Sequence, residues 1–362
     1  MSQVGARAAK ENPVLKALSK FSKDFMSVLG IIFLGAILSL TTEKFLQWDN
    51  LKLILLQSST VAICALGQAI ILLTGNFDLS LGRNVAFTSC LGALLMKGML
   101  YDGMAPMNPT LVILIILAAG TFIGVCNGLL TAYVGLPAFI ATLGLQNVCY
   151  GLAKVITNAT PIATFPNSIA WLGRGFAFPE ILKKNLPWCV VLMLGIYIFA
   201  QFIFTKTKLG RNIYAVGGNK EAAFFAGINV KRYTFLAFVM AGFLAAFSGV
   251  VLMSRLNSVA ITNGQSYEFD AVIGSIIGGI SLTGGKGRLI GTMFGIIFVM
   301  LLFNGMTQWK VDAFMQDVLK GIVLVIAVTL DVLRNRKRTT GERIATEAAT
   351  RQEYASEDRD PT

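Results

Sequence analysis

Histidine is absent from this 362-residue chain, and charged residues make up only 14% of it. Soluble domains carry about 25% charged residues, so a chain this poor in charge is expected in a lipid bilayer. Without histidine the chain lacks the commonest metal ligand and general base, which disfavours hydrolases and metalloenzymes. We therefore expect no catalytic residue, no metal site and no cofactor.

Cysteine pairs and nucleotide-binding loops are also missing. The five cysteines lie in or beside apolar segments with no CxxC spacing, which predicts packing roles. The segment Ser281–Arg288 is superficially similar to a phosphate-binding loop, but Ile280 stands where its first glycine belongs, and Gly287 follows Lys286 where Ser or Thr is required. We find no nucleotide site in the sequence, so any ATPase that acts with this chain must be another chain.

Long apolar segments dominate what is present: 55% of the residues are hydrophobic and the mean hydropathy is +0.67. A membrane-spanning helix needs about 20 apolar residues. Ten segments are candidates: Phe25–Leu40, Leu51–Leu73, Leu79–Leu100, Thr110–Val134, Pro137–Ile156, Trp188–Phe204, Tyr233–Ser254, Phe269–Leu282, Leu289–Gly305 and Ala313–Leu333. The sequence predicts an all-α polytopic membrane protein with about ten transmembrane helices, its membrane domain at 25–334.

The positive charge lies at the N-terminal arm 1–24, at the loop Thr205–Arg232 and at the start of the polar tail 335–362. Cytoplasmic loops carry an excess of Lys and Arg, so these three regions are expected in the cytoplasm, and an even number of crossings separates them. The net charge of +12 therefore does not indicate nucleic-acid binding. The loop Thr157–Pro187 is predicted outside although it carries three cations against one acid. The polar residues before the first apolar segment argue against a cleavable signal peptide.

The loop Thr205–Arg232 carries six cations against one acid, and its middle predicts a short helix from Asn219 to Gly227. Asn219 can cap the helix, Glu221 suits the first turn, Ala222 and Ala223 propagate it, and Gly227 ends it. We expect a docking surface here; the alternative is a solvated linker.

Two apolar segments are short or interrupted. Leu79–Leu100 contains two cations, and Phe269–Leu282 contains three glycines. Irregular backbone at membrane depth persists only beside protein or a water-filled cavity, so both segments could line a pathway; the alternative is ordinary helices with snorkelling ends.

The motif FDxxxG begins at Phe77 and again at Phe269, and GTxxG follows at Gly120 and at Gly291. Because the matched segments are predicted to run in opposite directions, an inverted internal repeat is possible.

Asp78 and Asp270 open these two segments, so each could cap a helix or mark a substrate route. Nearby polar groups are mostly uncharged, which suits a neutral polyhydroxylated solute; the alternative is hydrogen bonding between helices. Gln68, Asn127 and Gln146 are among these uncharged groups. The candidate substrate-pathway residues are Asn76, Asp78, Ser80, Phe139, Thr142, Asn147, Glu268, Asp270 and Asn304.

Four stretches carry a resemblance: GNFDLSLG at Gly75–Gly82, PAFIATLG at Pro137–Gly144, LGRNIYAVGGNKEAAFFAGINV at Leu209–Val230, and YEFDAVIGSIIGGISLTGGKGRLIGT at Tyr267–Thr292. In this order they resemble the inner-membrane permeases of ribose-type ABC sugar importers, over roughly Phe45 to Asp331. The resemblance implies a pair of permease chains in the lipid of the bacterial inner membrane, a cytoplasmic ABC ATPase pair and a periplasmic sugar-binding protein. It also implies alternating access and a coupling helix that contacts the ATPase, at Asn219, Lys220, Glu221, Ala222, Ala223, Phe225, Gly227 and Ile228.

The chain departs from the family pattern at two places. Asn76 and Phe77 follow Gly75 where the family has glycine and isoleucine, and Phe303–Trp309 replaces an Asn-Asn-Gly run. Both departures put the identity of the sugar in doubt. We expect a permease for a neutral pentose, hexose or analogue. A permease for branched-chain amino acids or nucleosides is the first alternative, and an ion-coupled secondary transporter, which would need more buried carboxylates, is the second. A membrane enzyme is disfavoured by the missing histidine.

Overall fold

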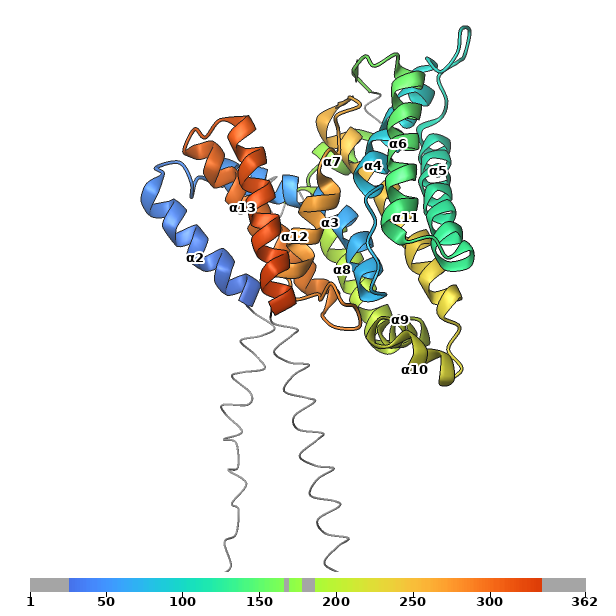
Figure 1. The fold of residues 1–362 in the computed structure, drawn as a ribbon. Helices are drawn as coiled ribbons and strands as arrows, with labels where there is room; N and C mark the ends of the chain where they lie inside the picture. The colour runs from blue at the N-terminus through green and yellow to red at the C-terminus, as the bar shows by residue number, and fades with distance from the viewer. Residues whose placement is uncertain (1–25, 166–168, 178–185, 334–362) are drawn as a thin grey trace, which may run out of the picture.

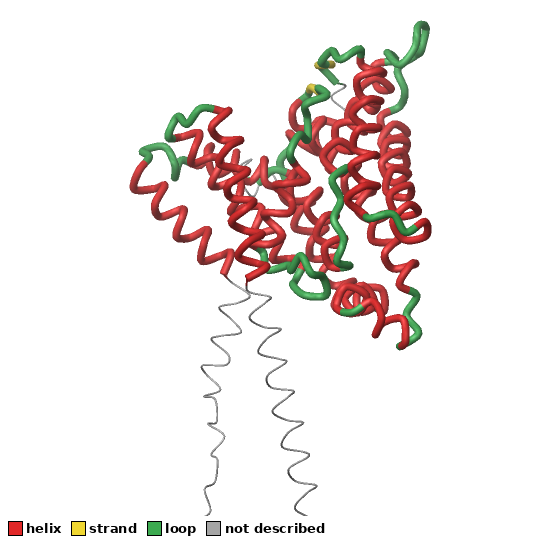
Figure 2. The backbone as a smooth tube through the Cα atoms, in the orientation of Figure 1, coloured by secondary structure: helices red, strands yellow, loops and turns green. Residues whose placement is uncertain are grey.

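The protein is described by a computed structural model that covers residues 26–165, 169–177 and 186–333. The N-terminal arm 1–24 and the polar tail 335–362, which were predicted to be cytoplasmic, lie outside the described residues. Helices dominate the described part, and the two short strands lie at the end of the molecule away from α9 and α10 (Figures 1 and 2). The first and last described helices both reach the end of the molecule on the α9–α10 side (Figure 1).

The helices follow the predicted apolar segments closely. In chain order they are α2 (Met26–Thr41), α3 (Trp48–Leu73), α4 (Leu81–Lys97), α5 (Pro109–Leu129) with a π-helical end (Leu130–Val134), α6 (Ala138–Thr157), α7 (Ala170–Arg174), α8 (Trp188–Lys206), α9 (Lys208–Gly218), α10 (Lys220–Phe225), α11 (Val230–Leu256), α12 (Tyr267–Ile277), α13 (Leu289–Gln308) and the final described helix, Ala313–Leu333. β1 (Ile162–Ala163) pairs antiparallel with β2 (Ser258–Val259).

Seven of the described helices are long and apolar enough to cross a membrane, which confirms an all-α multi-pass architecture. Three predicted spans form shorter helices: α2 with 16 residues, α4 with 17 and α12 with 11. Length and composition therefore support fewer crossings than the predicted ten.

Helix α3 is the centre of the molecule. Every residue from Ser58 to Leu73 is buried, and α3 packs against α8, α11, α12 and α13. A helix that is apolar on all sides is stable where neighbours surround it, which explains why α3 has no polar face.

Glycines bring α5 and α11 together. A Cβ atom on Gly242 would lie 2.6 Å from the backbone oxygen of Gly120, and one on Gly124 would collide with the backbone oxygen of Phe238. Lipid tails are as apolar as leucine, so helices in a bilayer associate through this kind of close backbone contact.

The short helices α4 and α12 begin next to each other. Residues 74–80 form an irregular segment that runs back alongside the helices before α4 starts (Figure 1). A Cβ atom on Gly264, just before α12, would lie 2.6 Å from the backbone oxygen of Gly82 in the first turn of α4. The predicted span Leu79–Leu100 is therefore shorter than expected, because its first residues belong to this break.

The cationic loop holds two helices where one was predicted. Helix α10 matches the predicted short helix, and α9 precedes it. Helix α9 buries Gly210, Ile213, Val216 and Gly217 on one face and leaves its cations exposed. We did not predict α9, because two of its four buried residues are glycines and give a weak apolar signal.

Replacing Gly242 by Leu should lower the free energy of unfolding by about 1–3 kcal/mol, because the larger side chain forces α5 and α11 apart. Thermal unfolding of the purified protein in detergent measures the change. Gly144→Leu on α6 is the matched control, since nothing lies within 4 Å of a Cβ at that position. Equal melting of the two variants would show that the glycine contact does not hold these helices together.

Candidate functional site

Asp78 organises the break between α3 and α4. Its Oδ1 accepts hydrogen bonds from the backbone N and the Oγ of Ser80, both at 2.7 Å, and its Oδ2 accepts one from Asn127 Nδ2 at 3.3 Å. The Asn127 amide also donates to Ser80 Oγ at 2.8 Å. Asp78 is only 1% exposed. The carboxylate therefore holds the backbone at the start of α4 and ties that start to α5.

Helix α6 supports the same segment. The backbone N of Leu79 donates to Thr142 Oγ1 at 3.2 Å, and Thr142 Oγ1 donates to Ala138 O at 2.8 Å. A backbone N–H in an irregular segment has no helical acceptor, so a side-chain oxygen from a neighbouring helix is needed at this depth. The structure thus brings three predicted residues together, Asp78, Ser80 and Thr142, with Asn127 between them.

The second acidic group lies in the first turn of α12. Asp270 Oδ1 is 3.4 Å from Lys320 Nζ on the final described helix, and the two side chains are 4% and 21% exposed. The Lys320 ammonium also lies 4.6 Å from the centre of the Phe303 ring. We missed Lys320 in the sequence, although a lone cation within an apolar helix indicates a buried partner.

Glu268 faces α4. A Cβ atom on Gly82 would collide with its Oε2, so only glycine leaves room for this side chain. Glu268 Oε2 is buried and accepts no hydrogen bond from the described residues. Arg83, next to Gly82, donates to Ile261 O at 3.3 Å, and its guanidinium carbon lies 4.3 Å from the centre of the Tyr150 ring. Glu268 thus carries one buried carboxylate oxygen, Oε2, that no described residue satisfies.

The three carboxylates lie beside α3 or just beyond its end. Helix α12, which carries Glu268 and Asp270, packs against α3, and Asp78 follows the last residue of α3 by five positions. Gln68 of α3 is fully buried, and neither end of its amide has a hydrogen-bond partner in the described part of the chain. We call Asp78, Glu268 and Asp270 the central polar cluster.

Four predicted pathway residues lie outside this cluster or form hydrogen bonds with residues close to them in the sequence. Asn304 exchanges amide hydrogen bonds with Asn50 at 2.8 and 3.1 Å, and Gln308 donates to Asn50 at 3.0 Å. Asn76 bonds to Thr74 Oγ1 at 2.9 Å, and the exposed Asn147 donates to Leu143 O of its own helix at 3.0 Å. Phe139 is exposed on α6. Asn304 therefore joins α3 to α13, the interhelical role that was the alternative in the sequence.

The short helix α10 has the predicted cap and end. Asn219 Oδ1 accepts a hydrogen bond from Ala222 N at 3.0 Å, and Gly227 has a φ of +78°, which favours glycine. The buried Ala223 accepts a backbone hydrogen bond from Ile228 at 2.9 Å. Lys220, Glu221 and Ala222 are exposed. This confirms the predicted local structure of the loop.

Two aromatic rings project from α10. Phe224 is 69% exposed and Phe225 is 85% exposed, and their ring centres are 5.8 Å apart. Helix α10, which carries them, lies at the tip of the α9–α10 end and is not among the helices counted as membrane spans (Figure 1). Large rings exposed in this position are typical of a surface that a partner protein covers.

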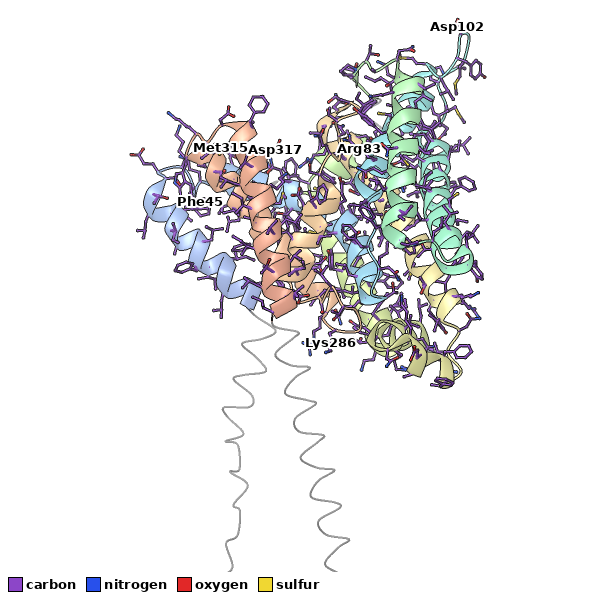
Figure 3. All side chains as sticks on the ribbon, viewed as in Figure 1. Phe45, Arg83, Asp102, Lys286, Met315 and Asp317 are labelled. Carbon is purple, nitrogen blue, oxygen red and sulfur yellow. The ribbon has the colours of Figure 1, made fainter. Side chains whose placement is uncertain are left out.

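Helix α9 connects α10 to the membrane helices. The Asn212 amide donates to the Tyr233 hydroxyl of α11 at 2.7 Å, and the Tyr214 hydroxyl donates to Gly287 O at 2.8 Å. Burial raises the pKa of Tyr214 to about 12, so the phenol stays neutral and keeps the proton that it donates. Lys286 lies at this end of the molecule and Asp102 at the opposite end (Figure 3).

Helix α9 also contacts the end of α3. A Cβ atom on Gly217 would collide with the backbone oxygen of Leu73, and Gly285 N donates to that same oxygen at 2.9 Å. Leu73 is the last residue of α3, five residues before Asp78. Helix α9 therefore contacts the start of the break that contains Asp78.

Comparison with known proteins bears on the whole chain. Residues 50–328 match the family described as "Branched-chain amino acid transport system / permease component". The chain is 36% identical over 305 residues to the ribose import permease protein RbsC of Bacillus subtilis, which covers 84% of this chain and 91% of that one. It is 34% identical over 339 residues to the galactose/methyl galactoside import permease protein MglC of Escherichia coli K12, covering 90% and 100%. No solved structure matches the chain.

Replacing Lys320 by Met should lower the free energy of unfolding by about 3 kcal/mol, because Asp270 would keep a buried charge without its partner. The double variant Lys320→Met/Asp270→Asn should recover most of this loss. Unfolding in detergent, followed by tryptophan fluorescence, measures both. Lys310→Met in an exposed loop is the control, and a loss as large in the control would remove the special role of the buried pair.

Proposed function

The chain belongs to the family of import permeases that it matches over residues 50–328, and we propose that it is the membrane-spanning subunit of an ATP-driven importer of a neutral pentose, hexose or close analogue. The observation that carries the proposal is its similarity to import permeases named for ribose and galactose, over 91% and 100% of their lengths. The polar side chains at the α3–α4 break agree with a neutral solute, because amides and hydroxyls supply both donors and acceptors to sugar hydroxyls.

The proposed mechanism is alternating access driven from another chain. The sequence has no nucleotide-binding loop, so ATP would be hydrolysed by a separate ABC ATPase that contacts Phe224 and Phe225 on α10. Closure of the ATPase pair would move α9 against Leu73 and shift the segment that carries Asp78. This chain would change shape without making or breaking a covalent bond of the solute.

Orientation and partners follow from charge and from the family. We propose that the α9–α10 end faces the cytoplasm, because it carries the cationic loop, and that both chain termini lie on that side of a bacterial inner membrane. A periplasmic sugar-binding protein would dock at the opposite end, which includes β1 and β2. A second permease chain, identical or paralogous, would complete the transporter.

We also propose that all ten apolar helices cross the membrane, the shorter α2, α4 and α12 included, and that the chain arose by an inverted duplication. The repeated GTxxG motifs support the duplication, since their glycines make close helix contacts in both halves. Gly291 and Gly295 pack on α12. Gly124 packs on α11, and Gly120 packs between α4 and α11. In both halves the motif therefore places its glycines against neighbouring helices.

A branched-chain amino acid is the second candidate solute, and the description of the matched family favours it. An amino acid carries a carboxylate, which would need a cationic partner along the route. Near the central polar cluster, Lys320 pairs with Asp270, and Arg83 donates to the backbone and packs on Tyr150. Arg255 at the end of α11 has a buried Nε without a hydrogen-bond partner among the described residues. The relatives named for ribose and galactose, rather than the cations, therefore favour the sugar.

Replacing Phe225 by Asp should uncouple transport, because the exposed ring would be lost from the ATPase contact while the fold remains intact. We expect uptake to fall by about thirtyfold or more, as for a central interface residue. Co-purification of the ATPase and its stimulated ATP hydrolysis measure the contact. Tyr101→Asp, an exposed aromatic at the opposite end, should keep both, and unchanged stimulation in Phe225→Asp would refute the assignment.

Uptake of labelled ribose, galactose, leucine and ribose 5-phosphate tests the solute class in cells with the full transporter. We expect a neutral sugar to be taken up, and Asp78→Asn to reduce its uptake by about tenfold, because an amide replaces a charge-assisted acceptor. Asp102→Asn in an exposed loop should leave uptake unchanged. Uptake of leucine alone would move the chain to the second candidate, and normal uptake by Asp78→Asn would restrict this residue to the start of α4.

A further inference from the structure

An apolar groove runs along the outside of α8, bounded by α3, α5, α9 and α11. Its volume is about 590 Å³, and Thr121 contributes the one side-chain hydroxyl of its lining. Thr121 Oγ1 donates to Leu117 O of its own helix at 2.6 Å, so it offers the groove no free donor. The groove can accept hydrocarbon but not a sugar, and it is separate from the central polar cluster.

The length of the groove suits a lipid tail. On α8 the lining extends from Leu192 to Phe204. At 1.5 Å per residue this is about 18 Å, close to the depth of about 15 Å of one bilayer leaflet. Phe199 and Phe243 on the rim are 65% and 43% exposed, so the groove opens sideways toward the membrane.

One end of the groove is cationic. Lys206 and Lys208 flank the α8–α9 junction beside the lining residue Leu209, and Arg211 follows one turn later with its side chain bonded to Lys206 O at 3.2 Å. All three cations are exposed, and no acidic residue occurs between Thr205 and Gly218. Arg232 lies two helical turns before the lining residue Val239 on α11 and adds a fourth exposed cation. We call Lys206, Lys208 and Arg211 the basic collar.

We propose that the groove holds one acyl chain of an anionic phospholipid and that the basic collar binds its phosphate. An apolar slot of leaflet depth with cations at its membrane-surface end matches the two parts of such a lipid, hydrocarbon and anionic headgroup. A second copy of this chain could fill the groove with apolar side chains, but it would leave the cations of the basic collar without an anionic partner. The lipid would also brace α9, since Leu209 lines the groove and Gly217 contacts the end of α3.

Native mass spectrometry of the full chain in detergent tests the headgroup. Phosphatidylglycerol should give a saturable adduct, phosphatidylcholine with the same acyl chains should bind more weakly, and glycerol phosphate should not bind. The triple variant Lys206→Gln/Lys208→Gln/Arg211→Gln should bind phosphatidylglycerol about fivefold more weakly for each charge removed. Lys44→Gln/Lys310→Gln, which removes exposed cations from the turns after α2 and α13, should bind it normally. Equal affinity for the two lipids, or normal binding by the triple variant, would overturn the proposal.

A second variant tests the tail. Ala200 is buried in the lining, so Ala200→Phe should fill the slot and abolish the phosphatidylglycerol adduct with the collar intact. Gly195→Phe on the same helix is the matched control, because a Cβ there meets nothing within 4 Å and the residue lies outside the lining. Normal lipid binding by Ala200→Phe would place the lipid elsewhere. A change in oligomeric state with normal lipid binding would assign the groove to a second copy.

Discussion

The constraint on which the rest of the structure depends is that backbone groups inside a bilayer must find partners within the protein. The break between α3 and α4 is where this constraint is hardest to meet. Helix α3 ends at Leu73, and the next helical turn begins at Leu81. Two amides of the break are satisfied by side chains, Leu79 N by Thr142 and Ser80 N by Asp78. The conformation of the irregular segment therefore depends on Thr142 of α6 and Asn127 of α5 as well as on its own residues.

This dependence links the fold to the proposed function. The glycine contact that holds α5 on α11 also fixes Asn127 beside Asp78, and the contact of α9 with Leu73 touches the same segment from the other end. Three carboxylates with little exposure lie beside α3 or just beyond its end. Buried charges in a membrane are expensive, and they persist where the surrounding structure pairs them or where a function uses them. Asp78 is hydrogen-bonded to Ser80 and Asn127, and Asp270 forms an ion pair with Lys320. Glu268 Oε2 has no hydrogen-bond partner among the described residues, so Glu268 is the carboxylate that packing explains least.

Local chemistry was predictable from the sequence, and long-range pairing was not. The apolar segments were found within a few residues because hydrophobic length is a property of the chain itself. Helix α10 was found because its cap and its terminal glycine lie within nine residues. The pairs Asp270–Lys320 and Asn50–Asn304 join residues 50 and 254 positions apart, so no local pattern could connect them. Helix α9 was not predicted because its buried face contains two glycines. Glycine allows the close contact with Leu73, but it weakens the apolar pattern by which a helix is recognised.

The ion pair between Asp270 and Lys320 has a consequence for how the protein is made. The helix Ala313–Leu333 is poorly packed, with only 6% of its most apolar window buried, yet it must carry a lysine into the bilayer. Ribosomes release the chain from its N-terminus, so Asp270 on α12 is synthesised before Lys320. Asp270 is therefore already in place when the helix that carries Lys320 leaves the insertion machinery. If the lysine stood at position 270 and the aspartate at position 320, the lysine would enter the membrane before its counter-ion had been synthesised.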